Sequence, residues 1–200
     1  MQRIAIFGGT FNPPHMGHIS AARACVESLG LNKLLMIPTN IPPHKKLPEG
    51  SPSPVQRLEM TAIAASMIPM AEACAIEIER SGPSYTADTA AEIKALYPES
   101  CLWLVIGTDM LESFERWREP DKIASICRLA AVARGEQDGR LIAEQVERLR
   151  KSIGARVDII YNRVIEGSST DFREGRAERL VPSEIRRFIK KNGLYGENNG

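Results

Sequence analysis

The sequence has almost no excess of either charge. It contains 26 lysine and arginine residues and 25 aspartate and glutamate residues, which gives a formal net charge of +1 at pH 7. A chain this close to neutrality has no general electrostatic attraction to nucleic acid or to a membrane surface. We therefore expect neither as a partner, and any basic chemistry has to be local.

Cysteine is also scarce. The chain has four scattered cysteines in apolar surroundings, without a Cys-x-x-Cys pair: Cys25, Cys74, Cys101 and Cys127. Disulfide frameworks and structural zinc sites need paired or clustered cysteines, so this spacing predicts reduced thiols in the core.

Long hydrophobic runs, internal repeats and low-complexity linkers are missing as well. The apolar run that begins at Ile4 stops at Gly8, which is too short for a signal peptide or a membrane span. We therefore expect a cytoplasmic protein. A chain of 200 residues is long enough for one hydrophobic core. The expected organisation is a single domain over residues 1–200, with a C-terminal helical subregion at about residues 168–195.

What the sequence does contain is an alternation of short apolar runs with segments of helical period. This pattern is typical of parallel β-α units with helices on both faces of a sheet. It predicts an α/β fold, a Rossmann-like open parallel sheet of five to six strands. The expected strands are Gln2–Phe7, Lys33–Ile37, Cys74–Ile78, Cys101–Ile106, Arg128–Ala133 and Val157–Ile160.

Segments of helical period fill the gaps between these runs. Helices are expected at His18–Leu29, at Ala87–Tyr97 behind the caps Ser84 and Thr86, and at Pro182–Gly193. Residues 38–54 are rich in proline and cannot form a helix or a central strand. A loop of that length in a compact α/β domain is usually functional or mobile.

The most informative segment joins the first expected strand to the first expected helix. Residues 8–18 read Gly-Gly-Thr-Phe-Asn-Pro-Pro-His-Met-Gly-His, at the position where an open parallel sheet binds ligands. Gly8 and Gly9 let the backbone approach a phosphate closely, and Thr10 adds a hydroxyl donor. The free N–H groups at the start of the following helix favour anions. The segment therefore predicts a phosphate site.

Two histidines in this segment strengthen that interpretation. His15 and His18 are three residues apart, so on one helical turn both can donate to a single oxyanion, and Gly17 keeps the space between them open. A His-x-x-His pair is also half of a metal site. No third cysteine, histidine or aspartate lies near in the sequence, which favours the phosphate.

This segment resembles the signature of the nucleotidyltransferase superfamily with the T/HxGH motif, and in detail it is similar to the bacterial nicotinate mononucleotide adenylyltransferases. The resemblance implies transfer of AMP from ATP to nicotinate mononucleotide, giving deamido-NAD (nicotinate adenine dinucleotide) and pyrophosphate in NAD biosynthesis. For this reaction we expect Mg²⁺ to arrive on ATP, held by phosphates and water rather than by a carboxylate cage. The ATP-binding residues that the resemblance implies here are Gly8, Gly9, Thr10, Phe11, His15 and His18.

The second half of this signature is a Ser-Ser-Thr-x-Ile-Arg-like segment that opens a helix near the carboxyl end. Ser168, Ser169, Thr170 and Arg173 match it, with Phe172 in place of the usual isoleucine. Such hydroxyls, and an arginine one turn on, donate to phosphate oxygens. An ordinary helix cap is the alternative interpretation of the hydroxyls. A second candidate at residues 183–186 lacks the paired hydroxyls, and the segment after residue 173 is shorter than in the family, which predicts a truncated helix.

The residues suit an attack by a phosphate on the α-phosphorus of ATP. A phosphate monoester with a second pKa of about 6 is largely dianionic at neutral pH, so it needs no general base. It needs positive charge and positioning, because anions are brought together and charge grows on the phosphoryl oxygens. We expect His18 to act on the α-phosphoryl oxygens and His15 and Arg173 to hold the ATP phosphates, all three as catalytic residues.

Other segments resemble the acceptor-binding elements of this family. Lys45, in Pro-Pro-His-Lys, is assigned to the phosphate of the acceptor, although His44-Lys45-Lys46 with Gln56-Arg57 is also consistent with a solvated basic patch. The backbone of Ser84, Tyr85 and Thr86 at a helix start could bind the nicotinate carboxylate. Trp117 is expected to stack on the pyridine ring, with a core tryptophan as the alternative. Gly107 and Asp109 follow an apolar strand, where an acid can accept both hydroxyls of the ATP ribose, with a turn aspartate as the alternative.

Alternative functions differ in the acceptor or in class. A pantetheine-phosphate adenylyltransferase-like enzyme would lack the Ser-Tyr-Thr and tryptophan elements. An aminoacyl-tRNA synthetase fragment shares the histidine motif, but the chain has no Lys-Met-Ser-Lys-Ser loop. A non-catalytic nucleotide-binding regulator would have no use for His15, His18 and Arg173. The oligomeric state stays open.

Overall fold

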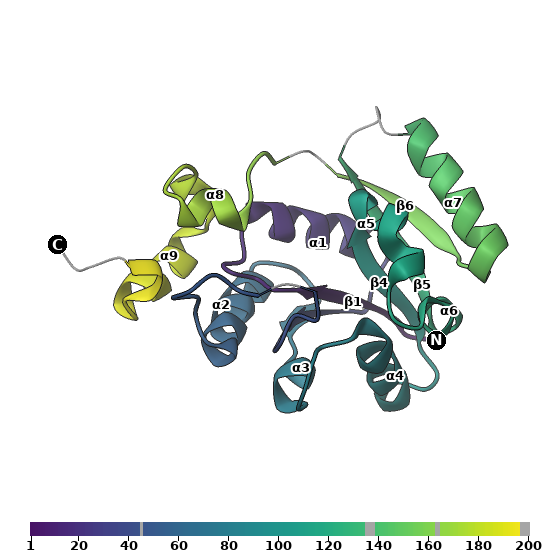
Figure 1. Cartoon of the computed structure of the whole chain (residues 1–200), viewed down its shortest axis with the longest axis horizontal. Helices are drawn as coiled ribbons and strands as arrows, with labels where there is room; N and C mark the ends of the chain where they lie inside the picture. Colours follow the sequence, from purple (N-terminus) through teal and green to yellow (C-terminus); the bar gives the residue numbers. More distant parts are fainter. Residues whose placement is uncertain (45, 135–138, 163–164, 197–200) are drawn as a thin grey trace.

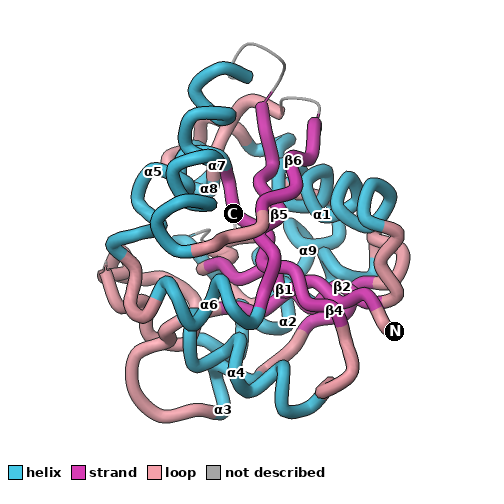
Figure 2. The backbone as a smooth tube through the Cα atoms, turned by 90° about the vertical axis from the view of Figure 1, so that its right-hand side faces the viewer, coloured by secondary structure: helices cyan, strands magenta, loops and turns pink. Residues whose placement is uncertain are grey.

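The structure is a computed structural model that describes residues 1–44, 46–134, 139–162 and 165–196. Within these residues six parallel strands form one sheet in the order β3-β2-β1-β4-β5-β6. Figure 2 shows them side by side in a twisted layer. The strands are β1 (Arg3–Gly9), β2 (Lys33–Pro38), β3 (Ala71–Ala73), β4 (Cys101–Gly107), β5 (Cys127–Arg134) and β6 (Val157–Asn162).

The order of the strands places a change of direction at the centre of the sheet. The chain starts with β1, moves outward through β2 and β3, and then returns to add β4, β5 and β6 on the other side of β1. Loops that leave the carboxyl ends of β1 and β4 therefore diverge and open a crevice between them. Ligands of open parallel sheets bind in this crevice.

Helices cover both faces of the sheet, as Figure 1 shows for α1 and α4. The first face is covered by α1 (Met16–Leu29), α2 (Pro54–Ser66) and α9 (Ser183–Lys191). The opposite face is covered by α4 (Thr86–Leu96), α5 (Thr108–Ser113), α6 (Pro120–Ile126) and α7 (Gly139–Ile153). The short helical elements are α3 (Ile76–Glu79), η1 (Phe114–Arg116), α8 (Ser169–Arg173), η3 (Glu178–Leu180) and η4 (Leu194–Gly196).

The strands divide their apolar side chains between these two layers. In β4, Trp103 and Val105 pack under α1, whereas Leu102, Leu104 and Ile106 pack towards α4 and α5. All five are at most 4% exposed. Burial on both faces explains why the sequence shows near-continuous apolar runs instead of alternation.

Most of the expected elements are confirmed, with ends shifted by one or two residues. The parallel α/β sheet, the proline-rich loop and the terminal helix are present, and α1 ends where Gly30 adopts a left-handed conformation (φ 55°). The strand expected at Cys74–Ile78 is wrong. The edge strand β3 pairs only Ala71–Ala73 with β2, and the chain then turns into α3, which brings Glu77 to Thr89 of α4.

Among the helices that the structure describes, none combines the length and the apolar character needed to cross a bilayer.

Candidate active site

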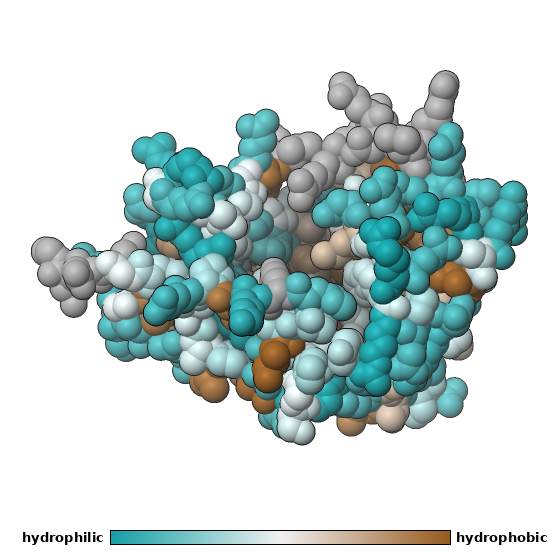
Figure 3. Space-filling model, in the orientation of Figure 1, coloured by the Kyte–Doolittle hydropathy of each residue, from teal (hydrophilic) through white to brown (hydrophobic). Residues whose placement is uncertain are grey.

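A cavity of about 300 Å³ opens at the carboxyl edge of the sheet, between β1 and β4. Its lining includes Gly8, Gly9 and Thr10, at the end of β1, and Ile106, at the end of β4. The face of the molecule drawn in Figure 3 is mostly hydrophilic and is hollowed near its centre. The crevice expected from the strand order is therefore lined by the glycine-rich segment.

The two histidines of the motif begin α1 together. His15 is the N-cap residue, and its Nδ1 accepts a hydrogen bond from the Gly17 N–H at 3.1 Å. The Nδ1 of His18 accepts one from the His15 N–H at 3.2 Å, so the two imidazoles form a reciprocal capping box. Their ring centroids lie 3.7 Å apart. The sequence motif is thus both a helix start and a pair of imidazoles in contact, tilted by 37° to one another.

These bonds determine which ring nitrogen carries the hydrogen. A neutral imidazole whose Nδ1 accepts a hydrogen bond carries its hydrogen on Nε2. Burial, and next the nearby His15, hold the pKa of His18 well below its ordinary value. His18 is therefore neutral at pH 7, and its Nε2–H is a donor suited to a phosphate oxygen.

Two small-residue positions make room for this pair. A Cβ at Gly17 would lie 2.9 Å from Cε1 and 3.0 Å from Nδ1 of His15. A Cβ at Gly9 would lie 3.1 Å from the ring of Phe11. That ring is 1% exposed and packs edge-on against His18, with centroids 5.0 Å apart. The side chain of Phe11 thus packs against His18 in the core and is closed to a ligand.

The second motif forms hydrogen bonds with the loop of the first motif, although the bonded residues lie 156 and 161 positions apart in the sequence. The Ser169 hydroxyl donates to the Pro13 carbonyl at 2.8 Å, and Nη1 of Arg173 donates to the Asn12 carbonyl at 2.5 Å. The other arm of Arg173 donates to Oγ1 of Thr170 at 2.9 Å. The loop before α1 and the whole of α8 are therefore joined, and α8 ends at Arg173 as the short following segment predicted.

Asn12 connects this loop to two further segments. It is 3% exposed, its Nδ2 donates to Oγ of Ser51 at 2.9 Å, and its Oδ1 accepts from the Tyr195 hydroxyl at 2.7 Å. Burial raises the pKa of Tyr195, which keeps the hydroxyl protonated as a donor. The proline-rich loop and the C-terminal η4 thus both bond to one side chain of the motif.

The three hydroxyl residues of the second motif have different partners. Ser168 caps α8, because its hydroxyl accepts from the Asp171 N–H at 3.2 Å and donates to Oδ2 of Asp171 at 2.6 Å. An ordinary cap therefore describes Ser168, whereas Ser169 and Thr170 bond to the first motif and to Arg173. The competing segment at residues 183–186 begins α9, where Arg186 pairs with Glu178 at 2.7 Å.

Asp109 follows the carboxyl end of β4. It is in the first turn of α5, and its carboxylate folds over Gly107, where any Cβ would collide with Oδ1. Glycine at this position therefore leaves room for the acid. Neither Gly107 nor Asp109 is among the described residues that line the cavity, which reaches Ile106 and Met110 on either side of them.

The opposite wall of the cavity includes the start of α4. The expectation that Ser84 and Thr86 cap this helix is wrong, because the N-cap is Tyr85 and no side chain bonds the first-turn N–H groups. The Ser84 hydroxyl instead accepts a hydrogen bond from the Asn40 N–H at 3.1 Å. Helix N–H groups without a side-chain cap favour an anion. Ser84, Tyr85 and Thr86 all line the cavity.

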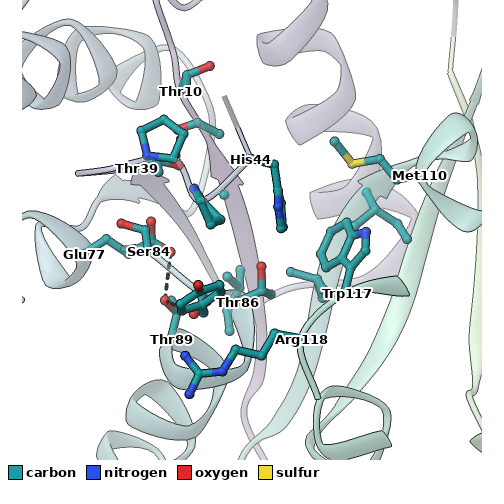
Figure 4. A pocket seen from close by; sticks show the side chains of 18 of the residues that line it. Thr10, Thr39, His44, Glu77, Ser84, Thr86, Thr89, Met110, Trp117 and Arg118 are labelled. Carbon is teal, nitrogen blue, oxygen red and sulfur yellow. Dashed lines mark hydrogen bonds between the residues drawn. The ribbon is translucent and has the colours of Figure 1, made fainter. Parts of the chain in front are cut away.

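Rings line the rest of this wall. Trp117 lies across the cavity from Ser84 and Glu77 (Figure 4). It packs against Phe114 with ring centroids 5.2 Å apart. The guanidinium of Arg118 lies 4.4 Å from the centre of the Tyr85 ring, and such a contact is a cation–π interaction. Lys45, the residue expected at the acceptor phosphate, lies outside the described residues.

Three residues in or near this site have no catalytic or binding role expected from the sequence. His44 and Glu77 line the cavity, and burial raises the pKa of Glu77, whose Oε1 accepts from Thr89 at 2.8 Å. Arg57, read as part of a basic patch, is 0% exposed. A signal for Arg57 existed, because it shares a helical stripe with the buried residues Met60, Thr61 and Ala64.

No group of three or more histidine, cysteine, aspartate or glutamate side chains converges on a common point in the described part of the chain. The donors near the crevice are imidazole, hydroxyl, guanidinium and backbone N–H groups, all of which can donate to phosphate oxygens.

The chain matches a family model for cytidylyltransferase-like proteins over residues 6–175. It is 33% identical to nicotinate-nucleotide adenylyltransferase of Bacillus subtilis (strain 168), over 98% of this chain and 99% of that protein. It is 36% identical to the probable nicotinate-nucleotide adenylyltransferase of Dehalococcoides mccartyi, over 96% and 97%. A solved structure of Plasmodium falciparum nicotinic acid mononucleotide adenylyltransferase complexed with NaAD has a TM-score of 0.77 at 18% identity and covers 99% of each chain.

The structural likeness supports the fold, and the two bacterial relatives extend along nearly the whole chain. Together with the bonds between the hydroxyl-arginine segment and the loop before the histidine pair, these matches place the chain in the nicotinate-nucleotide adenylyltransferase family, among the cytidylyltransferase-like proteins.

Proposed function

We propose that this protein transfers the adenylyl group of ATP to the phosphate of nicotinate mononucleotide, forming deamido-NAD and releasing pyrophosphate in NAD biosynthesis. The observation that carries the proposal is the union of the two motifs on one loop: Ser169 and Arg173 of α8 bond to the carbonyls that precede His15. This loop borders the crevice where a parallel sheet binds nucleotides.

The acceptor phosphate is itself the nucleophile. One of its oxygens attacks the α-phosphorus of ATP, a P–O bond forms, and the bond to the β-phosphate oxygen breaks, so that pyrophosphate leaves with that electron pair. The acceptor is mostly dianionic at pH 7, since the second pKa of a phosphate monoester is about 6. The protein therefore has to hold the phosphates in line and stabilise charge, without removing a proton.

His18 is the proposed donor to the α-phosphoryl oxygens in the transition state. Its Nδ1 is occupied by the His15 N–H, so it offers Nε2–H in one fixed orientation. Donors that are already oriented stabilise developing charge without reorganising during the reaction. His15 and Arg173 are proposed to hold the ATP phosphates, with Gly8, Gly9, Thr10 and the backbone of Phe11 beneath them.

The remaining ATP contacts follow from the carboxyl edge of the sheet. Asp109, folded over Gly107, is proposed to accept hydrogen bonds from the ribose hydroxyls. The backbone N–H groups of Ser169 and Thr170 are proposed to bind phosphate, while Ser168 holds the helix start in place. Mg²⁺, bound by phosphate oxygens and water, would neutralise part of the triphosphate charge.

The acceptor is proposed to occupy the cavity between α4 and Trp117. The uncapped start of α4 supports a carboxylate contact with the backbone at Ser84, Tyr85 and Thr86. Trp117 is proposed to stack on the pyridine ring. Lys45 keeps its assignment to the acceptor phosphate as a proposal from the family resemblance.

The test is an assay of pyrophosphate release with purified protein, ATP, Mg²⁺ and one acceptor at a time. Nicotinate mononucleotide is expected to give the highest kcat/KM, followed by its amide, with phosphopantetheine inactive. Product is identified by mass as deamido-NAD. Equal kcat/KM for the acid and the amide would contradict the carboxylate contact, and a preference for phosphopantetheine would overturn the proposed function.

A further inference from the structure

Arg57 is a buried cation without a buried anion beside it. It lies in the first turn of α2 and is the largest side chain in the described residues with essentially no exposure. No carboxylate forms an ion pair with it in the described part of the chain, and burial lowers its pKa. A charged group in such surroundings is costly unless it is paired or hydrogen-bonded. The groups that the Arg57 guanidinium contacts should therefore explain why a charged side chain is buried here.

The guanidinium bonds to two loops that have different tasks. Nη1 donates to the Thr10 carbonyl at 2.9 Å, and Nη2 donates to the Asn40 carbonyl at 3.3 Å. The Nε atom is buried and has no partner among the described residues. Thr10 belongs to the loop proposed to receive the ATP phosphates, and Asn40 follows β2.

Asn40 continues this connection to the acceptor wall. Its N–H donates to the Ser84 hydroxyl at 3.1 Å, and the Ser84 N–H donates to the Ile41 carbonyl at 2.9 Å. The side-chain amide of Asn40 donates to the carbonyl of Arg80 at 3.3 Å. A continuous series of hydrogen bonds therefore leads from Thr10 through Arg57 and Asn40 to the turn that begins α4.

We propose that Arg57 is a positioning residue for adenylyl transfer. By bonding to the carbonyls of Thr10 and Asn40, it fixes the separation between the ATP loop and the acceptor turn, so that the attacking oxygen and the α-phosphorus meet in line. This inference rests on the proposed function. Arg57 contacts neither reacting group through these bonds, so it acts on the step that needs both substrates in register.

This role needs the planar guanidinium group of arginine, because one side chain must donate hydrogen bonds to two carbonyls on separate loops. Lysine carries the same charge but has a single ammonium on a flexible stem. Arg57→Lys therefore separates the charge of Arg57 from its bridging geometry. Arg57→Gln, which has an amide and no buried charge, is the second variant in case the lysine variant does not fold.

The experiment measures kcat, both KM values and the dissociation constant of each substrate alone, at a temperature well below the unfolding midpoint of each variant. Arg57→Lys is expected to lower kcat by roughly tenfold to a hundredfold, since small misplacements of reacting groups have effects of that size. The dissociation constants of ATP and of nicotinate mononucleotide measured singly are expected to change less than threefold. A merely structural role would not produce this split between separate binding and joint reaction.

The matched control is Arg23→Lys. Arg23 also donates from Nε and Nη2 to a backbone carbonyl, that of Met67, but it lies on α1 away from the cavity. Its replacement is expected to leave kcat unchanged. A folded Arg57→Lys or Arg57→Gln variant with the kcat of the wild type would overturn the inference, as would a loss confined to the affinity for one substrate. If instead the wild type and Arg23→Lys made no deamido-NAD, the proposed function itself would fail.

Discussion

The loop from Thr10 to His15 receives hydrogen bonds from Arg57 of α2, from Ser169 and Arg173 of α8, and from Tyr195 of η4. The wall across the cavity is held differently. Trp117 rests on Phe114 and Tyr85 lies against Arg118, so ring contacts are added there to the hydrogen bond between Ser84 and Asn40.

This difference corresponds to what each side is proposed to bind. The triphosphate chemistry needs donors in fixed positions, because preorganisation determines how much charge they stabilise. The acceptor side has to select a ring and a carboxylate, for which an apolar wall and one uncapped helix start suffice. Substitutions on the two sides should therefore act on different kinetic constants.

The largest effect is expected for His18→Ala. It removes the proposed fixed Nε2–H donor, so kcat should fall by roughly a hundredfold to a thousandfold, as for other single oxyanion donors. The KM for ATP should change little, because the other donors remain. Steady-state kinetics with both substrates measure this. His44→Ala, on the acceptor side, serves as the matched histidine control, and equal losses of kcat in the two variants would break the comparison.

A smaller effect is expected for Trp117→Ala, and it should appear in the KM for the acceptor instead of in kcat. Loss of a stacking ring should raise the KM for nicotinate mononucleotide by roughly fivefold to a hundredfold, given that stacking contributes about 1–3 kcal/mol per base. The KM for ATP should stay near that of the wild type. Trp117→Phe, which keeps a ring, should recover most of the affinity. An alanine variant with a changed ATP KM alone would show that the two sides are not separate.

Tyr195→Phe tests how firmly the ATP loop is held. The variant keeps the edge-to-face contact with Phe172 but leaves Oδ1 of Asn12 without its donor. Loss of one partner of a buried pair should lower the free energy of unfolding by about 1–2 kcal/mol. Urea unfolding measures this change in stability. Because the ATP loop loses one of its hydrogen bonds, the KM for ATP should also rise by a few-fold. An equal rise in the KM for the acceptor would contradict a loop-specific role.

The smallest effect concerns protonation of His18. Its pKa is lowered by burial and by the nearby His15, whereas an unfolded histidine titrates near about 6.5. The folded protein therefore binds fewer protons than the unfolded chain below that pH, so this contribution to stability is complete above about pH 6.5 and is lost as the pH falls. Imidazole NMR signals of the three histidines should show one that stays neutral below pH 6. If all three titrated at about 6.5, the lowered pKa of His18 would be wrong.

Much of the fold and part of the site could be predicted from the sequence. The apolar runs located five of six strands, because strands buried on both faces leave a long signal in the sequence. The two motifs could be placed together, since segments that follow parallel strands meet at one edge. The fold and the family are confirmed. The residue roles, Mg²⁺ and a cytoplasmic location stay predictions.

What could not be predicted depends on contacts between distant segments. Ser84 looked like a helix cap, but its hydroxyl bonds to Asn40, which lies 44 residues earlier. Arg57 looked like a solvated charge, and although its position on the stripe of α2 signals burial, nothing in the sequence indicates that it bonds to the carbonyls of Thr10 and Asn40. The run at Cys74–Ile78 had the composition of a strand, but only three residues of β3 find a partner at the sheet edge before the chain turns.

The hydrogen bond between Asn12 and Tyr195 also bears on how the protein is made. The two residues are 183 positions apart, so during translation the glycine-histidine loop leaves the ribosome long before its last partner is synthesised. A nascent chain can build β1 and α1 early, but the loop acquires this bond only when η4 has emerged. Prematurely terminated chains that lack Tyr195 therefore carry the full motif without the contact that η4 supplies.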